Sequence, residues 1–216
     1  MARYHYRDGV TLEKKRGRAL LIIIGILIFA AAAYVAAIYL APQMVTVPFT
    51  SMTPDAVGQK VQQSKAGQFG DRLYIPQINI DVPVATGGGK DALEAGAWLR
   101  DTNVGAPDTG GNVALGAYQF TWDITPLWSK QKSPFYNLGK VNEGDDITLD
   151  YKNVRYVYRI DRKFSTTNTQ QIEQKSDDAR LTLFAVNGDG SAAGTVISGK
   201  QISPVKRTSS VDAVTE

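Results

Sequence analysis

The side chains that most often carry covalent or metal chemistry are nearly missing from this chain of 216 residues. It contains no cysteine, and its one histidine, His5, lies close to the N-terminus. The chain after residue 41 therefore has no thiolate nucleophile, no imidazole base, no disulfide and no zinc site built from Cys and His. Carboxylates, hydroxyls, lysines, tyrosines and backbone groups remain for any chemistry.

Two short patterns of such groups could be chemical. Ser129 and Lys132 have the Ser-x-x-Lys spacing at which a lysine could activate a serine, but the companion motifs of penicillin-recognising enzymes are missing. Asn187, Asp189 and Ser191 alternate like the start of a calcium loop, although the invariant glycine and the closing glutamate of that loop are both replaced. We interpret the first pattern as a chance match and the second as a plain turn. The sequence predicts no metal and no cofactor.

A third feature is an aromatic cluster in a proline-containing stretch: Phe120, Trp122, Trp128, Phe135 and Tyr136. Exposed Trp and Tyr favour interfaces, so this cluster could be a recognition surface. The alternative, which we favour, is that it buries a long loop onto the folded domain.

The element that positions everything else is an apolar segment near the N-terminus. Residues 19–41 hold no charge over 23 positions, whereas a bilayer core requires about 20 apolar residues in a helix. A signal peptide would have a shorter apolar core followed by a cleavage site of small residues. We interpret residues 19–41 as an uncleaved membrane-spanning helix, with the lipid bilayer as its partner.

Charges on the two sides of this segment predict its orientation. Residues 1–18 carry six basic and two acidic side chains, and the remainder carries 18 basic and 19 acidic ones. The positive-inside bias places the N-terminus in the cytoplasm and the rest outside the cell membrane, in a single-pass arrangement. The pI near 9.0 therefore reflects the N-terminal tail, and we expect no nucleic-acid partner.

Composition divides the chain into five parts. We expect a cytoplasmic basic tail, the transmembrane helix, a polar extracytoplasmic stalk, one β domain and a polar tail, at residues 1–18, 19–41, 42–70, 71–205 and 206–216. The stalk contains one short helix, with Thr53 as its N-cap and Pro54 at its first position, which ends near Lys65. We expect this helix only to hold the domain away from the membrane.

Within the β domain, the apolar residues follow the periodicity of strands. The expected strands are 72–75, 78–82, 113–118, 147–151, 154–160, 181–186 and 195–202. Prolines end the first two, short helical turns are expected at 91–95 and 125–130, and residues 166–174 form a polar connector. Because seven or so short strands with little helix would expose edges, closure into one barrel is the natural arrangement.

Five blocks of this domain resemble the sortase family, the membrane-anchored cysteine transpeptidases of mainly Gram-positive bacteria. The blocks are RLYIPQINIDVPV at 72–84, LEAGAW at 93–98, GNVALGAY at 111–118, FYNL with GDDI between 135 and 147, and LTLFAV at 181–186. Their order and spacing over about residues 71–203 make the match specific. The resemblance implies a mainly β fold, a closed eight-stranded sortase-like β-barrel with short helices, in addition to the transmembrane helix.

The resemblance also locates the residues of the family's reaction. In that reaction a thiolate attacks a peptide carbonyl, an imidazole protonates the leaving amine and an arginine donates to the oxyanion. An ungapped alignment puts Tyr118, Val186 and Gly194 at the positions of the histidine, cysteine and arginine. All three catalytic side chains are lost, which indicates a pseudoenzyme.

The resulting hypothesis is a catalytically inactive domain that binds or scaffolds in the assembly of surface proteins or pili. Its partner would be an extended peptide or a cell-surface protein, held by Tyr118, Val186, Asn187 and Trp122. One alternative is that Tyr118 and Val186 simply pack the barrel. A second is a hydrolase or transferase that uses hydroxyl or carboxylate chemistry near Tyr118, Asn187 and Asp189, and a third is a structural spacer.

Overall fold

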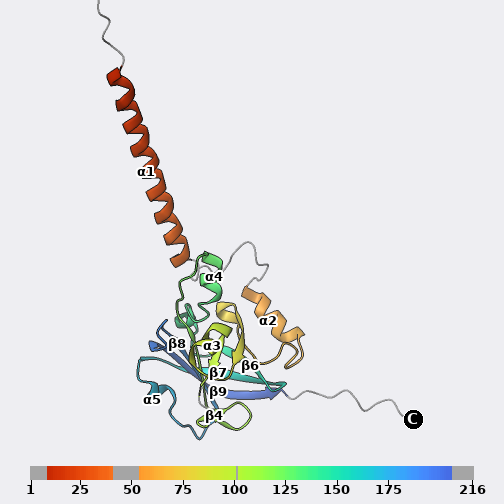
Figure 1. Cartoon of the computed structure of the whole chain (residues 1–216). Coiled ribbons are helices and arrows are strands. Elements are labelled where there is room, and N and C mark those ends of the chain that lie inside the picture. Colours follow the sequence, from red (N-terminus) through yellow and green to blue (C-terminus); the bar gives the residue numbers. More distant parts are fainter. Residues whose placement is uncertain (1–8, 41–53, 101, 206–216) are drawn as a thin grey trace, which may run out of the picture.

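A computed structural model describes residues 9–40, 54–100 and 102–205, which form one long helix and a β domain (Figure 1). Helix α1 spans Gly9–Leu40. Within the described residues it is the one helix that is long and apolar enough to cross a membrane, from Arg18 to Leu40. His5, the expected N-cap Thr53 and the polar tail 206–216 lie outside the described residues.

Nine strands form the β domain. They are β1 Arg72–Ile75, β2 Ile80–Ala85, β3 Ala97–Leu99, β4 Gly105–Ala106, β5 Gly110–Tyr118, β6 Asp146–Tyr151, β7 Val154–Thr166, β8 Arg180–Val186 and β9 Ala192–Val205. They pair in the order β3-β2-β1-β6-β7-β9-β8-β5, and a further β3–β5 pairing closes this ring of eight. The two-residue β4 pairs only with β5. The expected closed eight-stranded barrel with short helices is confirmed.

Short helices connect the strands. They are α2 Pro54–Gln63, α3 Gly89–Ala95, α4 Pro126–Gln131, α5 Thr169–Ile172, and the 3-10 turns η2 Pro76–Ile78 and η3 Leu138–Lys140. At the start of α4, the Thr125 hydroxyl accepts a hydrogen bond from the Trp128 backbone N–H at 3.2 Å. This cap satisfies a donor that the first helical turn would otherwise leave without a partner.

Alternation along each strand separates the inside of the barrel from its outer surface. On β5, Leu115 and Ala117 belong to the main core, and on β8 so do Leu183 and Ala185. The intervening residues, among them Tyr118, face outward because successive side chains of a strand point to opposite faces. The charged residues Asp150 of β6 and Arg155 of β7 likewise lie outside the main core.

Four expectations about the elements need correction. The strand expected at 78–82 begins only at Ile80, because Ile78 ends the turn η2 and Asn79 adopts a left-handed conformation with φ of 54°. Pro83 does not end its strand: it lies within β2 opposite Arg72, and the β2–β3 pairing begins only at Val84, so the missing N–H of Pro83 costs no bond to β3. The polar connector at residues 166–174 contains helix α5. Its residue Ile172 is 1% exposed and packs the helix against the barrel. Strand β7 continues beyond residue 160 to Thr166 through an irregularity between Ile160 and Arg162.

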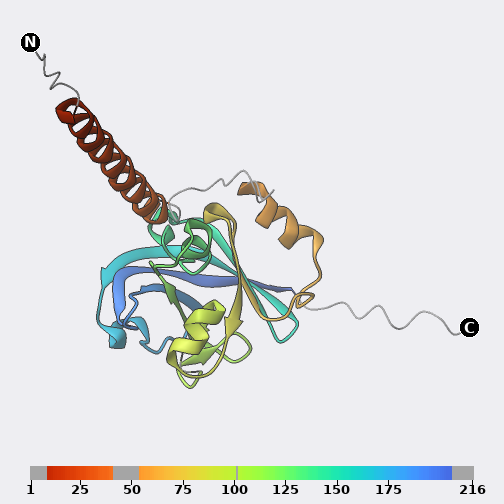
Figure 2. The same ribbon diagram turned by 45° about the horizontal axis from the view of Figure 1, so that its top comes forward.

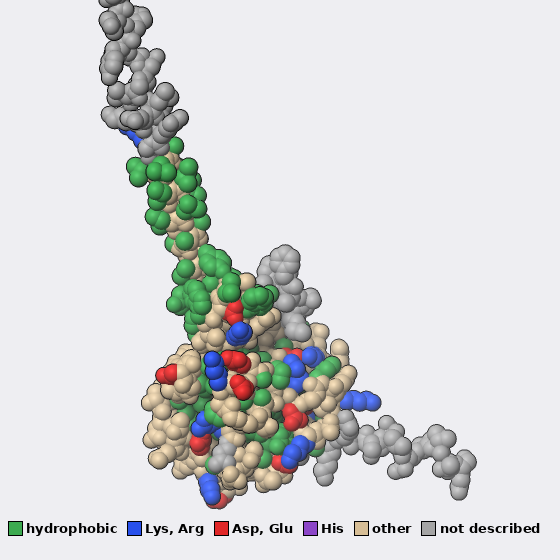
Figure 3. Space-filling view, in the orientation of Figure 1, with side chains coloured by type: hydrophobic (Ala, Val, Ile, Leu, Met, Phe, Trp, Pro, Cys, Tyr) green, Lys and Arg blue, Asp and Glu red, His purple; other side chains and the backbone are tan. Residues whose placement is uncertain are grey.

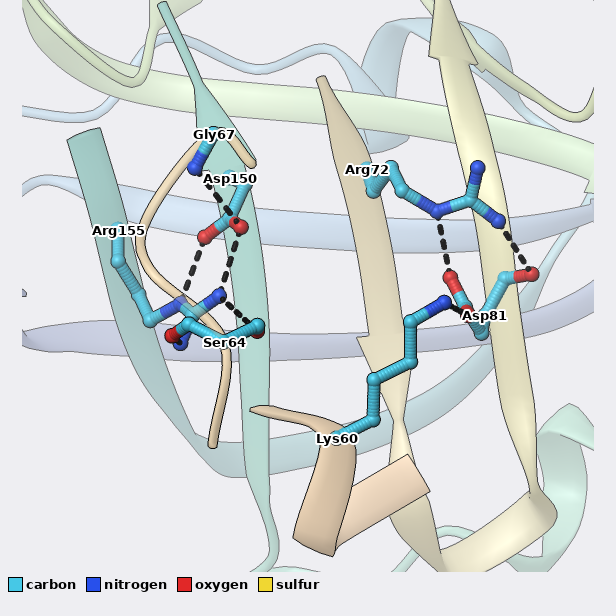
Figure 4. A network of polar contacts seen from close by, with 7 residues as sticks. All are labelled: Lys60, Ser64, Gly67, Arg72, Asp81, Asp150 and Arg155. Carbon is cyan, nitrogen blue, oxygen red and sulfur yellow. Dashed lines mark hydrogen bonds and ion pairs between the residues drawn. The ribbon is translucent and has the colours of Figure 1, made fainter. Parts of the chain in front are cut away.

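Helix α2 packs on the barrel, which corrects the expectation that this helix only holds the domain away from the membrane. Val57 has no exposed surface, and Lys60 forms an ion pair with Asp81 of β2. Arg72 of β1 donates to the same carboxylate at 2.6 Å from its Nε. Figure 4 shows both cations converging on Asp81.

A second set of charges holds the last turn of α2 and the chain that follows it. Arg155 of β7 donates to both carboxylate oxygens of Asp150 on β6, at 2.7 and 2.8 Å. It also donates to the carbonyl oxygens of Val61 and Ser64, and the Gly67 N–H donates to Asp150 at 3.2 Å. Figure 4 shows that Asp150 and Arg155 tie the segment after α2 to the hairpin β6–β7.

Candidate functional site

The structure brings together the three positions that correspond to the catalytic residues of the resembling family. Tyr118 ends β5 and pairs in parallel with Val186 at the end of β8. The Gln119 N–H donates to the Val186 carbonyl oxygen at 2.8 Å, which extends the pairing by one residue. Gly194 lies on β9, the other neighbour of β8. The three positions are thus on three adjacent strands.

An apolar cluster on the outer surface of the barrel occupies this place. Tyr118 is 5% exposed and Val186 has no exposed surface. Helices α3 and α5 contribute Leu93 and Ile172, and the full cluster comprises Leu93, Ala114, Tyr118, Ile172, Phe184, Val186, Ala192 and Val196. The two side chains therefore pack under helices, which agrees with the packing alternative of the sequence analysis.

Gly116 permits this packing. A Cβ atom at residue 116 would lie 2.7 Å from Cζ of Phe184 and 3.1 Å from Cγ2 of Val186. Real Cβ atoms do not approach other carbons so closely, so a side chain here would displace the Phe184 ring. The Phe184 ring can lie against β5 only because residue 116 lacks a side chain.

The backbone at Gly194 is unsuited to an arginine. Its φ of 96° lies in the region that residues with a Cβ atom rarely adopt. A Cβ atom built there would also lie 3.3 Å from Oγ of Ser165. The position that aligns with the family's arginine has a local conformation that favours glycine.

A pocket of about 240 Å³ opens beside Tyr118. It is lined by Gly89, Lys90, Leu93, Trp98, Arg100, Tyr118 and the loop residues Gly188, Asp189 and Gly190. Of the four residues predicted to bind a ligand, Tyr118 lines this pocket, whereas Val186, Asn187 and Trp122 do not. Trp98 and Arg100 are pocket residues that the sequence analysis missed. They line the pocket because the loop at residues 188–190 lies opposite them, and no local sequence pattern indicates that contact.

The charged groups around the pocket are engaged with neighbours. Arg100 pairs with Glu173, and its guanidinium lies 4.2 Å from the centre of the Trp98 ring. Lys90 is 3.7 Å from Glu94, one helical turn further along α3. Hydrogen bonds from the Ser191 hydroxyl and then from its backbone N–H hold the pKa of Asp189 below its usual value. Asp189 is therefore ionised near neutral pH and has no proton to donate.

The loop between β8 and β9 is a plain turn, as interpreted from the sequence. The Asn187 N–H donates to the Ser191 carbonyl oxygen at 2.8 Å, and the Asn187 amide donates to the Ser191 hydroxyl at 3.0 Å. In the described part of the chain, no group of three or more His, Cys, Asp or Glu side chains is arranged to hold a metal. Asn187 serves the loop's own structure.

The Ser-x-x-Lys pattern does not form a catalytic pair. Ser129 is fully buried and donates its hydroxyl hydrogen to the Thr121 carbonyl oxygen at 2.6 Å. Lys132 forms an ion pair with Asp123 at 2.7 Å. The serine therefore stabilises a loop, and the lysine is bound elsewhere.

The aromatic cluster divides between the core and the surface. Phe135 is 1% exposed and belongs to the main core. Trp122 and Trp128 are 49% and 50% exposed, so the expectation that the whole cluster buries its loop fails for these two residues.

The comparisons with known proteins agree with the barrel. The family model described as "Sortase domain" matches residues 73–188, which is more than half of the chain. The structure of Listeria monocytogenes sortase A is similar with a TM-score of 0.51 at 20% identity, covering 64% of this chain and 90% of that one. Streptomyces coelicolor sortase E1, solved with a tripeptide in its active site, gives 0.50 at 17% identity, covering 70% and 100%. The comparison with curated proteins finds no match.

The class of fold is defined by the eight-stranded barrel and by the three site positions, which lie on the neighbouring strands β5, β8 and β9. This chain belongs to the sortase family. These two solved structures, both under 25% identical, support the fold and leave the reaction to be argued from the residues of this chain.

Proposed function

We propose that the protein is a catalytically inactive sortase-like domain that binds an extended peptide segment of a cell-surface protein during surface-protein or pilus assembly. The observation that carries this proposal is the pairing of Tyr118 with Val186 where covalent catalysis would need an imidazole and a thiolate. The isopropyl side chain of Val186 cannot act as a nucleophile, and the phenol of Tyr118, packed in an apolar cluster, is not the imidazole that the family's reaction uses.

The pocket beside Tyr118 supports a binding role. Its lining combines the apolar side chains of Leu93, Trp98 and Tyr118 with charged groups and with backbone of a glycine-containing loop. Concave sites with an apolar lining and a few polar groups are the usual form of ligand sites. A volume of about 240 Å³ suits one or two side chains of a peptide.

The proposal includes anchoring by α1, with the N-terminus in the cytoplasm and the barrel outside. Support comes from the apolar stretch Arg18–Leu40, the basic residues before it, and membership of a membrane-anchored family. Accessibility of a cysteine placed at Ser176, probed with a membrane-impermeant maleimide on whole cells, tests the orientation. Labelling only after lysis would contradict it.

The catalytic part is tested with the full chain in detergent micelles. A sorting-signal peptide and an amine nucleophile are added, and the mixture is followed by mass spectrometry. We expect no cleaved peptide and no product joined to the amine. Either species, if it is absent when the chain is left out, would overturn the assignment as a pseudoenzyme, and its loss in the Tyr118→Phe variant would assign the reaction to that hydroxyl.

The binding part is tested through Trp98, which lines the pocket. In a W122F/W128F chain, Trp98 is the remaining tryptophan, and we expect its emission to change saturably when the peptide is titrated. Lys90→Glu, at the pocket, should change the Kd several-fold, because a charge reversal beside a bound ligand alters its local electrostatic interactions. Lys175→Glu is the matched control, since this exposed lysine lines a different pocket. Absence of saturation, or equal effects of both variants, would count against the pocket as the binding site.

The alternative of hydroxyl or carboxylate catalysis has less support. Asp189 is held ionised by Ser191, and Asn187 is bound within the same loop. An ionised Asp189 has no proton for the acid that departure of a leaving group requires, and the amide of Asn187 is not an acid.

A further inference from the structure

Exposed apolar side chains are concentrated in one short segment of the β domain. Within the described residues after α1, six large hydrophobic side chains are exposed: Phe69, Trp122, Ile124, Leu127, Trp128 and Ile202. Four of these six lie between residues 122 and 128, and Ile124 is 72% exposed. We call Trp122, Ile124, Leu127 and Trp128 the apolar rim.

The apolar rim lies against the end of α1. The Tyr39 ring stacks on Phe120 with their centres 5.1 Å apart and meets the Trp122 ring edge-on at 5.5 Å. The Tyr34 hydroxyl donates to the carbonyl oxygen of Ile124. Figures 1 and 2 both show α4 beside the C-terminal end of α1, and Figure 3 shows hydrophobic side chains continuing from the helix onto the adjoining end of the domain.

These contacts fix the depth of the rim relative to the helix. At 1.5 Å per residue, Tyr34 lies about 9 Å before Leu40 along the axis. Because Ile124 contacts Tyr34 while Trp122 contacts Tyr39, residues 122–124 run alongside the last two turns of the apolar helix. The apolar stretch from Arg18 to Leu40 would measure about 35 Å, slightly more than the roughly 30 Å core of a bilayer. With the helix centred in that core, Tyr39 lies near the core boundary and Tyr34 lies several ångströms inside it, so the rim beside them would straddle the boundary between the core and the interface.

Two polar side chains of this segment, those of Asp123 and Thr125, have partners within or next to it. Asp123 is paired with Lys132 at 2.7 Å, and its side chain is 13% exposed. The Asp123 carboxylate also accepts the Ile124 N–H at 2.6 Å, and Thr125 caps α4. The exposed part of the segment is thus mainly apolar, which lowers the cost of placing it in lipid.

We propose that the apolar rim is a second membrane contact, inserted into the interfacial layer of the leaflet on the barrel's side. The proposal rests on α1 as the anchor. Tryptophan favours this layer because its ring is amphipathic. The occupant is lipid because the rim continues the surface of a helix that lipid would already surround. One consequence is that the barrel has a fixed orientation relative to the bilayer.

The three tryptophans of the chain provide the test. Three double variants each retain one tryptophan: W98F/W128F retains Trp122, W98F/W122F retains Trp128, and W122F/W128F retains Trp98. Full chains are reconstituted into phosphatidylcholine and phosphatidylglycerol vesicles whose acyl chains are brominated near the headgroup or near the methyl end. We expect Trp122 and Trp128 to lose most of their emission with shallow bromines and less with deep ones.

Trp98 is the matched control, because it donates its indole N–H to the Gly87 carbonyl oxygen at 2.8 Å and lines the pocket beside Tyr118. It should be quenched by neither lipid. A fourth chain, W98F/W122F/W128F with Phe29→Trp, reports on the anchor and should be quenched most by deep bromines. If Phe29→Trp is quenched while Trp122 and Trp128 are not, the rim proposal is overturned and the anchor stands. If none is quenched, the anchor itself fails; equal quenching of Trp98 would mean non-specific adsorption and also overturn the proposal.

Discussion

Two parts of the barrel's outer surface differ in chemistry although both are covered by helices. Over β1, β2, β6 and β7, the chain from α2 to Gly67 covers charged residues that are paired: Asp81 with Lys60 and Arg72, and Asp150 with Arg155. Over β5, β8 and β9, helices α3 and α5 cover an apolar cluster around Tyr118 and Val186.

The comparison shows that this chain retains buried charge where hydrogen-bond and ion-pair partners are present. Asp150 has no exposed surface, yet the Arg155 guanidinium and the Gly67 N–H satisfy its oxygens. A buried charge is tolerated when it has such partners. In a catalytically active member of the family, charged catalytic side chains on the surface over β5, β8 and β9 would also need such partners. In this chain Val186 and Gly194 place no charge at the corresponding positions. The charged surface holds an element in place, whereas the apolar surface shapes a pocket.

The largest effect is expected from breaking the buried pair. Asp150→Ala leaves the Arg155 guanidinium buried without its carboxylate, which should lower the free energy of unfolding by about 3–5 kcal/mol. Urea unfolding of the full chain in detergent measures this change. The matched control is Asp146→Ala: Asp146 forms the same two-bond contact with Arg159 across the same hairpin, but with side chains 43% and 55% exposed. Equal losses in the two variants would mean that burial is not what makes the first pair strong.

The apolar surface is tested next by adding one methyl group. Gly116→Ala would place Cβ within 2.7 Å of the Phe184 ring and should cost about 1–3 kcal/mol, because the surrounding cluster is closely packed. Gly188→Ala is the control, since a Cβ atom there meets nothing within 4 Å. A Gly116→Ala chain as stable as the control would indicate a loosely packed surface that could still open as a groove.

The sequence predicted the barrel well, for a physical reason. The continuous apolar run at 113–118 predicted a buried strand without knowledge of its partners, whereas the structure shows that Leu115 and Ala117 face inside and Tyr118 outside. The resemblance predicted that Tyr118 and Val186 are neighbours, as the β5–β8 pairing shows.

What the sequence missed depends on contacts between distant parts of the chain. The docking of α2 rests on pairs such as Lys60 with Asp81 and Ser64 with Arg155, which no local pattern indicates. Helix α5 was missed because one buried apolar residue, Ile172, is too few to produce a helical period. The exposure of Trp122 was missed because it depends on where the end of α1 lies.

A smaller effect is expected at the outer ion pair of the charged surface. Lys60→Met keeps much of the apolar stem and removes one of the two cations beside Asp81. Because the Lys60 side chain is 26% exposed and Arg72 still donates to Asp81, the loss should be about 1 kcal/mol or less. Urea unfolding at low and high salt measures it. A loss that matches that of Asp150→Ala would mean that the whole charged surface acts as one unit.

The smallest effect concerns the carboxylate that borders the pocket. The Ser191 hydroxyl, at 2.6 Å, is the main cause of the lowered pKa of Asp189, so Ser191→Ala should raise that pKa toward the ordinary 3.8. The backbone N–H at 2.9 Å still donates, so part of the lowering should persist. Because the folded-state pKa is the lower one, the loop gains stability from these bonds above about pH 4 and loses it as the pH falls through the folded value. Carbon NMR titration of the Asp189 carboxyl measures the shift. An unchanged pKa would mean that the Ser191 hydroxyl is not the group that lowers the pKa of Asp189, which would contradict the loop contact described above.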